Sequence, residues 1–387
     1  MQNERELTEI LERFKQGTLQ EDACALENLK SCSILLYGAG NIGKKLYSCL
    51  KENGIDVIGF LDRADTNSSN YEVPVYHPES RDIAKFKKNT HVILSALFPL
   101  NLSAEIKRQL SELGFEHVFA LHEVKLNSID CEGFYKNLFL GSYPINDMLD
   151  KDREKVLEAF SLFDTDEERE FYIQNIKAYV TRNFTGFKKP FDIALQYLAH
   201  DIPKKKNYSN FIDCGSFDGD TLRNLMQHDV GIKNYVAFEP QNKLCEKISN
   251  YIEQHKKSFE SALIFPCGVY SKIDKLTFSL STDALSVAKI DRAGNDIIQC
   301  VAIDDVLKGF HPTFIKMDIE GAEIEAVKGA KETIMKYHPQ LAICVYHSLS
   351  DMWEIPLLIK SFYNGYKFYL RNYQFMGLET VLYAFPD

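Results

Sequence analysis

The chain has 387 residues, of which 45% are hydrophobic and 26% charged, and its formal net charge at pH 7 is −10. Because single domains usually contain ~100–200 residues, this length predicts two domains that can each bury a core. The acidic balance disfavours sequence-independent binding to nucleic acid, which requires clustered lysine and arginine. The nine cysteines include no Cys-x-x-Cys pair, which indicates reduced thiols and no structural zinc site.

The first ten residues, MQNERELTEI, are polar and charged, unlike a secretory signal peptide. No apolar run approaches the ~18–20 residues needed to cross a bilayer. We therefore expect a cytoplasmic protein without a membrane span. Leu7, Ile10, Leu11 and Phe14 recur at helical spacing and predict an amphipathic helix over residues 3–15. We expect it to pack on its own domain; a contact between two copies in a homo-oligomer is the alternative.

A first glycine-rich turn follows. A strand at 34–37 runs into Gly38-x-Gly40-x-x-Gly43, then a helix, then a second strand that ends at Asp62. This order is typical of a dinucleotide-binding turn, in which glycines let the backbone approach a phosphate and the acid meets a ribose hydroxyl. The candidate residues of this second nucleotide site are Gly38, Gly40, Asn41, Gly43 and Asp62.

The alternation of strands and helices continues to about residue 120, with a strand at 91–96 and a helix at 103–113. Residues 30–124 therefore predict a small Rossmann-like unit. It is too short to include a dehydrogenase's catalytic half, and a purely structural turn is the alternative to a ligand site. The unit resembles the N-terminal nucleotide- or sugar-nucleotide-binding domains of bacterial polysaccharide-modifying enzymes, which implies NAD(P) or a UDP-sugar as a ligand.

Residues 125–205 differ in character from what precedes them. The stretch 123–144 has no clean period and is interpreted as a linker, whereas 147–163, 167–180 and 191–200 are expected to be helices. We expect these helices to cover the sheet of the second domain and its cofactor.

A second glycine-rich turn begins at a strand over 211–214. It has the form Asp213-x-Gly215-x-x-x-Gly219 and is followed by a helix that starts at Thr221. Three residues separate its glycines, rather than the two of the dinucleotide turn. The turn suits an amino-acid tail, because N–H groups at a helix start bind a carboxylate and Asp213 or Asp220 suits an ammonium group.

The strand after this helix ends in Glu239, ~20 residues past the second glycine, where an acid accepts both hydroxyls of an adenosine ribose. A third strand ends at Cys267 and Gly268, where an adenine ring would lie. This ordered set predicts S-adenosylmethionine as cofactor. The expected cofactor contacts are Asp213, Gly215, Ser216, Gly219, Asp220, Thr221, Glu239, Pro240, Cys267, Gly268 and Asp318.

Carboxylates gather after the fourth core strand, at 314–317, which follows a β-rich insertion over 275–305. Asp318, Glu320 and Glu323 fall within six residues there, and His347 follows the next strand. Open α/β sheets bind ligands at the carboxyl ends of their strands, so we expect Asp318 and His347 to face one cleft. Our hypothesis is that His347 or Asp318 is a general base and that Glu320 orients the substrate or the base.

Two alternatives apply to these residues. The carboxylates suit the start of the following helix, where they complement its dipole, and this is the interpretation we adopt for Glu323. A divalent cation held by Asp318 and His347 is the other alternative. Because the sequence contains no dense ligand set, no metal is predicted.

The C-terminal half resembles the FkbM family of methyltransferases. The resemblance rests on FIDCGSFDGDT, VAFEP, the step Ile303-Asp304-Asp305 and, above all, KMDIEGAE at 316–323. It implies a class I methyltransferase fold, with a mostly parallel sheet and an antiparallel last strand. It also implies O-methylation of sugar or polyketide hydroxyls and a role in polysaccharide biosynthesis.

These patterns together predict an α/β protein with two Rossmann-like domains. Residues 1–124 are the small nucleotide-binding type domain, 125–205 the linker and helical cover, and 206–387 the methyltransferase domain. The expected function is S-adenosylmethionine-dependent O-methylation of a sugar, a glycoconjugate precursor or a related small metabolite. The alternative is a bifunctional or non-catalytic nucleotide-sugar-binding protein.

Overall fold

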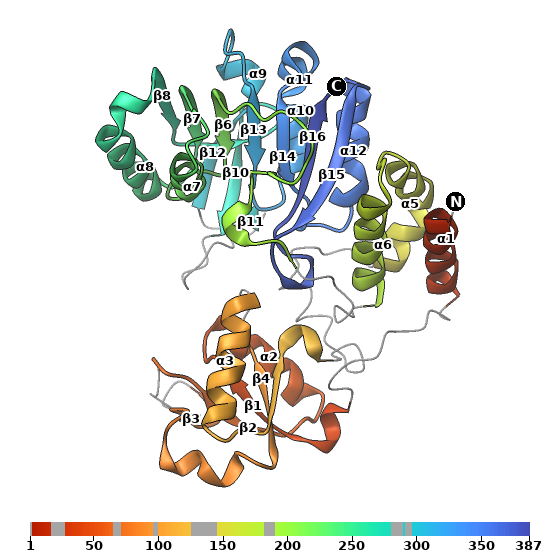
Figure 1. Ribbon diagram of the computed structural model, residues 1–387, viewed down its shortest axis with the longest axis vertical. Coiled ribbons are helices and arrows are strands. Elements are labelled where there is room, and N and C mark those ends of the chain that lie inside the picture. The colour runs from red at the N-terminus through yellow and green to blue at the C-terminus, as the bar shows by residue number, and fades with distance from the viewer. Residues whose placement is uncertain are drawn as a thin grey trace.

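The computed structural model describes residues 2–16, 28–64, 71–95, 100–124, 145–181, 190–279, 289–290 and 296–387. These residues form two α/β units, one around a five-stranded sheet and one around a seven-stranded sheet, and a small four-stranded sheet accompanies the second (Figure 1). The expected fold class, two Rossmann-like units, is confirmed. Among the described helices, none combines the length and apolar character that crossing a membrane requires.

The N-terminal unit is a parallel sheet in the order β3-β2-β1-β4-β5. Leu36 of its central strand belongs to the same apolar cluster as Leu46 and Leu50 of one helix, whereas the neighbouring Leu35 packs with Leu110 of another. Successive strand residues face opposite sides, so the two helices cover opposite faces. The elements are β1 (Ser33–Tyr37), α2 (Asn41–Glu52), β2 (Val57–Leu61), β3 (Val75–Tyr76), β4 (Thr90–Leu94), α3 (Leu100–Glu112) and β5 (His117–Ala120).

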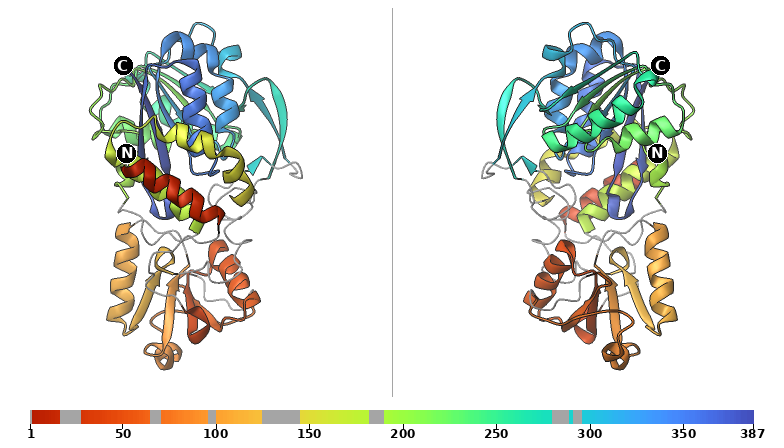
Figure 2. Two further views of the ribbon diagram at one scale, coloured as in Figure 1. Left: turned by 90° about the vertical axis from the view of Figure 1, so that its right-hand side faces the viewer. Right: turned by 90° about the vertical axis from the view of Figure 1, so that its left-hand side faces the viewer.

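The opening helix, α1 (Gln2–Lys15), differs from the expectation. It packs on α5 (Ile145–Phe160) and α6 (Asp166–Thr181) instead of on the five-stranded sheet (Figure 2). Ion pairs join Lys15 to Asp150 at 3.2 Å and Glu12 to Arg153 at 3.0 Å. An amphipathic pattern requires only that a helix bury its apolar side, and α5 and α6 supply the partner surface. The five-stranded unit therefore lies, in sequence, between helices that pack together.

These helices cover the β15 edge of the second sheet. α5 contacts α12 (Asp351–Phe362), and α6 contacts β15 (Tyr366–Asn372). We also expected these helices to cover the cofactor. The residues expected to bind the cofactor follow β6 and β7, which lie nearer the opposite edge of the sheet, so the helices do not cover them. A buried ion pair fixes the contact between α6 and β15, because Arg371 is 2.7 Å from Glu168. Arg371 also lies 2.6 Å from the exposed Asp201.

The helix expected at 191–200 is absent from the structure. Only a short 3-10 turn, Ile193–Leu195, forms there, and the backbone then enters the left-handed region at Tyr197 (φ 67°) and Ala199 (φ 47°). Left-handed residues cannot continue a right-handed helix. The segment instead runs as an irregular strap whose Tyr197 side chain is buried.

The C-terminal unit has the sheet order β15-β16-β14-β13-β6-β7-β8. β16 runs antiparallel to both of its neighbours and the central strands are parallel, which confirms the expected antiparallel last strand. Its elements are β6 (Asn210–Cys214), α7 (Asp220–Gln227), β7 (Asn234–Phe238), α8 (Asn242–Gln254), β8 (Ser261–Phe265), α9 (Ile303–Val306), β13 (Phe314–Met317), α10 (Glu323–Lys328), α11 (Lys331–Tyr337), β14 (Gln340–Cys344), α12, β15 and β16 (Thr380–Pro386).

The expected β-rich insertion lies between β8 and β13. It forms a four-stranded sheet in the order β11-β10-β12-β9. Its strands are β9 (Gly268–Val269), β10 (Asp274–Ser279), β11 (Lys289–Ile290) and β12 (Asp296–Val301).

Cysteines of the described segments are mostly reduced, as expected. Cys49 in α2 is the exception, since it is disulfide-bonded. The free thiols are Cys32, Cys214, Cys245, Cys267, Cys300 and Cys344.

Candidate active site

The glycine turn between β6 and α7 depends on its two glycines. Gly215 has φ 76°, and a Cβ at this position would lie 1.9 Å from the carbonyl oxygen of Asp318. Gly219 has φ 86° and is the N-cap of α7. Both residues have the left-handed backbone that favours glycine, and at Gly215 the close approach excludes a side chain as well. The turn therefore packs directly on the carboxyl end of β13, where the acidic residues begin.

Asp213 lies beneath this turn and not in an open cleft. Strand register pairs it with Lys316 on β13, whose Nζ is 3.2 Å from Asp213 Oδ1 and donates to the Gly215 carbonyl at 2.6 Å. Tyr235 donates its hydroxyl to Asp213 at 2.9 Å. Burial raises the pKa of Asp213 and Lys316 opposes that rise. The acid thus supports the turn, whereas Asp220 is exposed.

Ser216 and Thr221 are also buried. The Ser216 hydroxyl donates to the Asp213 carbonyl at 2.8 Å, and the Thr221 N–H donates to the Asp220 carboxylate at 2.7 Å. Phe217, between them, has φ 48° and is 37% exposed. These contacts hold the turn and the first residues of α7 in place.

Glu239 follows β7 beside the turn. Its carboxylate accepts the N–H groups of Phe217 at 3.1 Å and Gln241 at 2.9 Å, and Pro240 next to it is half-buried. Burial raises the pKa of Glu239 to about 7, while the two backbone donors act in the opposite direction. The expected ribose acid and the glycine turn are therefore directly connected.

The end of the third strand adjoins Glu239, whose N–H donates to the Phe265 carbonyl at 3.1 Å. The Phe265 ring stacks on Phe238 with centroids 4.9 Å apart. Cys267 is buried, and its burial raises the pKa of the thiol to about 11, so the thiol is neutral at physiological pH. A Cβ at Gly268 would lie 2.9 Å from Cys300 Sγ.

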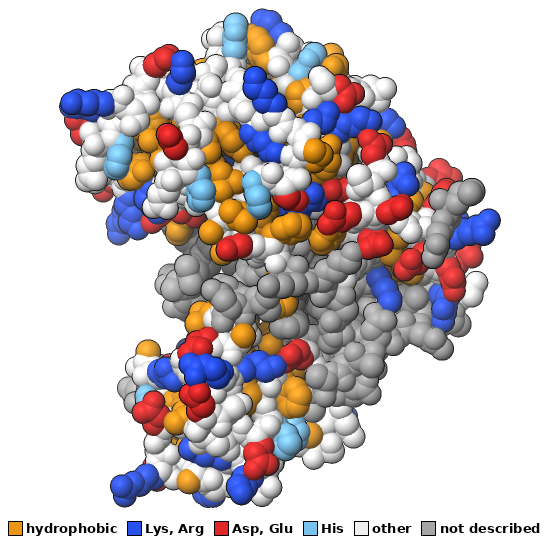
Figure 3. All heavy atoms as spheres, in the orientation of Figure 1, with side chains coloured by type: hydrophobic (Ala, Val, Ile, Leu, Met, Phe, Trp, Pro, Cys, Tyr) orange, Lys and Arg blue, Asp and Glu red, His pale blue; other side chains and the backbone are white. Residues whose placement is uncertain are grey.

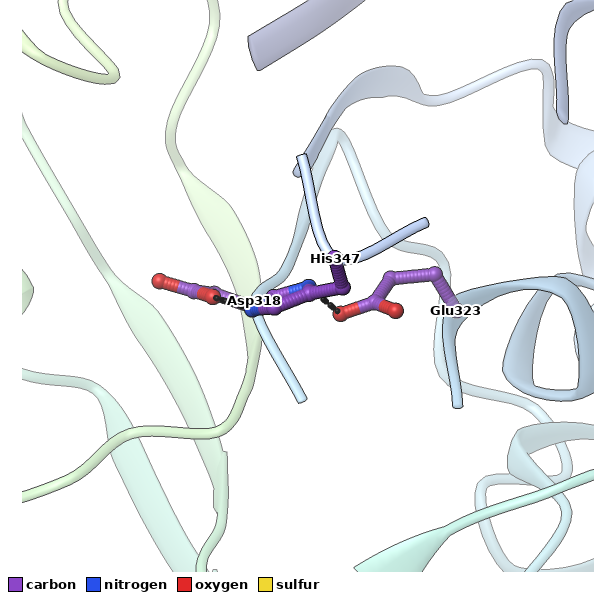
Figure 4. A group of neighbouring side chains, drawn as sticks. All are labelled: Asp318, Glu323 and His347. Atoms are coloured by element: carbon purple, nitrogen blue, oxygen red, sulfur yellow. Dashed lines mark ion pairs between the residues drawn. The ribbon is translucent and has the colours of Figure 1, made fainter. Parts of the chain in front are cut away.

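An acidic cluster lies where β13 and β14 end. His347 Nε2 is 3.6 Å from Asp318 Oδ1 and 3.5 Å from Glu320 Oε2, and His347 Nδ1 is 2.9 Å from Glu323 Oε1. Figure 4 shows the imidazole ring between Asp318 and Glu323. The structure thus brings together Asp318 and His347, the two residues expected to lie at one edge of the sheet, and places Glu320 beside them.

Glu323 has more than a helix-capping role. Its side chain is 1% exposed, and Oε1 accepts the Ile319 N–H at 2.8 Å in addition to contacting His347. This dual contact fixes the carboxylate against the imidazole ring. The sequence interpretation of Glu323 as a dipole-complementing acid missed the contact with His347.

The ionisable groups of this cluster shift one another's pKa values. Burial alone would lower the pKa of His347, but Glu323, Asp318 and Glu320 outweigh it and raise that pKa to about 10. Burial raises the pKa of Glu320 to about 8, His347 opposes the rise, and Asp318 adds to it. At neutral pH the imidazole is therefore charged and Glu320 is largely protonated.

Several residues with a left-handed backbone conformation lie around Asp318. Tyr197 (φ 67°), Glu320 (φ 58°) and Glu379 (φ 54°) are non-glycine residues with positive φ, a conformation that costs ~1–3 kcal/mol each and clusters at functional sites. Tyr197 donates its hydroxyl to Asp318 Oδ2 at 3.3 Å. Tyr346 is 3.3 Å from both Asp318 Oδ1 and Glu379 Oε1. Three segments distant in sequence thus meet at one carboxylate.

Several of these residues escaped the sequence interpretation. Lys316 stands inside KMDIEGAE and Tyr346 directly precedes His347, so a register argument could have found both. Tyr197 and Glu379 come from the strap and from the turn before β16, and nothing in the sequence pattern marked either one.

The N-terminal turn keeps its expected backbone. Gly38 has φ 109°, and a Cβ at Gly43 would lie 2.1 Å from the Gly38 carbonyl oxygen. Gly40 is the N-cap of α2, whose first residue is Asn41, and no described atom lies within 4 Å of a Cβ built on Gly40. The turn therefore needs glycine for the same close packing as a dinucleotide turn.

The acid of this turn already has backbone partners. Asp62 accepts the N–H of Ala39 at 2.9 Å and that of Ala64 at 2.8 Å. Tyr71 donates its hydroxyl to the Ala39 carbonyl at 2.8 Å. Both side chains thus stabilise the turn itself.

Comparisons with known proteins agree with this geometry. Residues 213–375 match the model of the methyltransferase FkbM domain. A crystal structure of methyltransferase FkbM from Methylobacillus flagellatus is similar over 98% of this chain and 99% of that chain, with a TM-score of 0.68 and 16% identity. At this identity the likeness shows a shared fold. None of the curated proteins compared with the chain matches it in sequence.

Proposed function

We propose that this chain, whose residues 213–375 are an FkbM methyltransferase domain, transfers a methyl group from S-adenosylmethionine to a hydroxyl group of a sugar, a glycoconjugate precursor or a related small metabolite. The observation that carries the proposal is the convergence on Asp318. Its carbonyl packs on the glycine turn and its carboxylate meets two phenols and an imidazole. The glycine turn that we assign to the cofactor and the groups that we assign to the reaction are therefore adjacent.

The cofactor is assigned along the carboxyl edge of the sheet. The N-terminus of α7 suits the carboxylate of the methionine tail, and the exposed Asp220 suits its ammonium group. Glu239 suits the ribose hydroxyls, and the segment at Cys267 and Gly268 lies beyond it for the adenine ring. Asp213, buried under the turn, contributes by holding the turn in shape.

The chemistry is a direct displacement. The acceptor oxygen forms a bond to the methyl carbon, the bond from that carbon to the sulfonium sulfur breaks, and the hydroxyl proton passes to a base. Of the two candidate bases, Asp318 suits the role, because a pKa of about 10 leaves His347 already protonated at neutral pH. Glu320, with a pKa of about 8, suits a hydrogen-bond donor that orients the acceptor.

The acceptor class follows from the charge of the site. Carboxylates and phenols accept and donate hydrogen bonds to neutral hydroxyl groups, whereas a phosphate placed beside the Asp318 carboxylate would be repelled. A neutral polyhydroxyl group therefore suits the site, as in a polysaccharide precursor. On the face drawn in Figure 3, basic and acidic side chains are interspersed, an arrangement that favours a small-molecule acceptor over nucleic acid.

The test uses Asp318→Asn, which keeps the shape of the side chain and removes the base. With a panel of sugars and sugar conjugates as acceptors, we expect methyl transfer to fall ~10²–10⁴-fold while calorimetry shows unchanged affinity for S-adenosylmethionine. Glu325→Gln is the matched control, because Glu325 binds Ser271 and Lys328 away from the cluster. Full activity of Asp318→Asn would remove Asp318 from the mechanism.

A second candidate function concerns the N-terminal unit. No described atom lies within 4 Å of a Cβ built on Gly40 at the start of α2, and this favours a nucleotide phosphate there, either of NAD(P) or of a UDP-sugar. Fluorescence titration of the full chain with NADPH and with a UDP-sugar separates the two ligands. Gly40→Asp should abolish whichever binding is seen, and an unchanged titration in that variant would refute the assignment.

A further inference from the structure

The buried imidazole of His347 presents a nitrogen to the acidic cluster without a hydrogen bond. His347 is 1% exposed, and neither ring nitrogen has a hydrogen-bond partner of good geometry among the residues that the structure describes, although Nδ1 forms an ion pair with Glu323. The nearest acids, Asp318 at 3.6 Å and Glu320 at 3.5 Å, lie beyond ordinary hydrogen-bond distance. A buried polar atom without a partner is costly and calls for a ligand.

The other ring nitrogen of His347 lies against a fixed carboxylate. Glu323 Oε1 contacts Nδ1 at 2.9 Å and is itself fixed by the Ile319 N–H. A histidine that binds a metal almost always donates its other ring N–H to a carboxylate, which sets the tautomer and aims the free nitrogen. Glu323 therefore leaves Nε2 as the electron-pair donor that faces Asp318.

The charge around Nε2 favours a cation. The Asp318 carboxylate faces Nε2, and Glu320, at 3.5 Å, becomes a second carboxylate when an incoming ion displaces its proton. Tyr346 links Asp318 to Glu379, a further acid of the cluster. The ammonium of Lys316 contacts Asp213 and the Gly215 carbonyl instead. The acids that attract a proton to His347 attract a metal ion for the same reason, and the ion would replace that proton.

We propose that a divalent cation binds between His347 Nε2 and the carboxylate of Asp318, with the Glu320 carboxylate able to join as a further ligand. Two ligands bonded to one ion at ~2.1 Å lie ~3.0 Å apart in octahedral and ~3.4 Å apart in tetrahedral geometry. The observed 3.5 and 3.6 Å exceed these separations by a few tenths of an ångström. Among the described residues, Asp318, Glu323 and His347 carry candidate ligand atoms within 4.8 Å of one another, and of these Glu323 lies on the Nδ1 side of the ring.

The donor set indicates which kind of ion fits. One imidazole with carboxylates suits an ion of intermediate softness, such as Mn²⁺, Fe²⁺ or Zn²⁺. A cation here would polarise an acceptor hydroxyl and lower its pKa. That consequence rests on the proposed methyl transfer, whereas the binding of the cation does not.

The test measures Mn²⁺ binding by the full-length protein after treatment with EDTA and its removal. Electron paramagnetic resonance of free Mn²⁺ and calorimetry should give one site per chain. Asp318→Asn should weaken binding at least ~10-fold, and Glu323→Gln ~10–100-fold, since it removes the group that aims the imidazole. Glu325→Gln, on the same helix as Glu323, should bind Mn²⁺ as the parent protein does.

Two results would overturn the cation site: no stoichiometric Mn²⁺ binding, or equal affinity in Asp318→Asn and Glu325→Gln. Circular dichroism and S-adenosylmethionine binding show in parallel that each variant is folded. Methyl transfer that persists in EDTA would likewise count against the cation but leave the proposed function standing. Mn²⁺ binding that depends on Asp318, without methyl transfer to any hydroxyl acceptor, would support the cation and refute the function.

Discussion

The chain contains two glycine turns of the same general kind in two different settings. In the N-terminal unit the acid after the second strand, Asp62, holds the turn through the N–H of Ala39. In the C-terminal unit Glu239 holds its turn in a similar way, but the adjoining strand β13 ends in the cluster at Asp318. The two turns thus share their glycines and a supporting acid, and they differ in the residues that follow the neighbouring strands.

The largest expected effect comes from replacing a glycine of each turn by alanine, because the two turns differ in the space around the added methyl group. Gly215→Ala places a Cβ 1.9 Å from the Asp318 carbonyl oxygen at φ 76°, so it should cost about 4 kcal/mol or more of unfolding free energy and abolish cofactor binding. Gly40→Ala meets no described atom within 4 Å and should leave the stability nearly unchanged. Urea unfolding and calorimetry measure both variants. Equal stability of the two would contradict the close approach in the second turn.

The contrast between the units was only partly visible in the sequence. The meeting of Asp318 and His347 was predictable, because the carboxyl ends of neighbouring parallel strands lie at one edge. The partner of Glu323 was not, because a residue at the start of a helix serves equally well as a cap. Tyr197 and Glu379 reach the site through left-handed backbone, which tertiary contacts impose against local preference.

The partner of α1 illustrates the same limit. Its apolar residues predict that one side of the helix is buried, and Leu7 is indeed 0% exposed. Periodicity carries no information on which surface covers that side. The complementary surface is supplied by α5 and α6, more than a hundred residues further along the chain, and only the assembled fold brings them together.

The second expected effect follows from the packing of α1 on α5 and α6. A substitution in α1 should change the stability of the C-terminal unit alone. The single tryptophan, Trp353, is buried in α12 and donates to Asp152 of α5 at 3.4 Å, so its fluorescence follows unfolding of the C-terminal unit. Leu7→Ala should lower that unit's unfolding free energy by ~2–4 kcal/mol, because it leaves a cavity in the packing of α1.

Leu50→Ala in α2 is the matched control, since Leu50 is equally buried but belongs to the five-stranded unit. We expect it to leave the fluorescence transition in urea where it is. The assignment of α1 to the C-terminal unit would fail if Leu50→Ala shifted this transition and Leu7→Ala did not.

The smallest expected effect is a pH dependence of cofactor affinity that comes from Glu239, the acid at the second glycine turn. Burial raises the pKa of Glu239 to about 7, so the carboxyl gains a proton as the pH falls through 7 and then accepts hydrogen bonds from ribose hydroxyls less well. The ionised fraction falls roughly tenfold between pH 8 and pH 6, and the affinity for S-adenosylmethionine measured by calorimetry should fall by up to that factor. Glu239→Gln cannot ionise and should bind weakly at both pH values. If the parent protein and Glu239→Gln showed the same pH dependence, the titrating group would lie elsewhere in the cleft, with Glu320 the next residue to substitute.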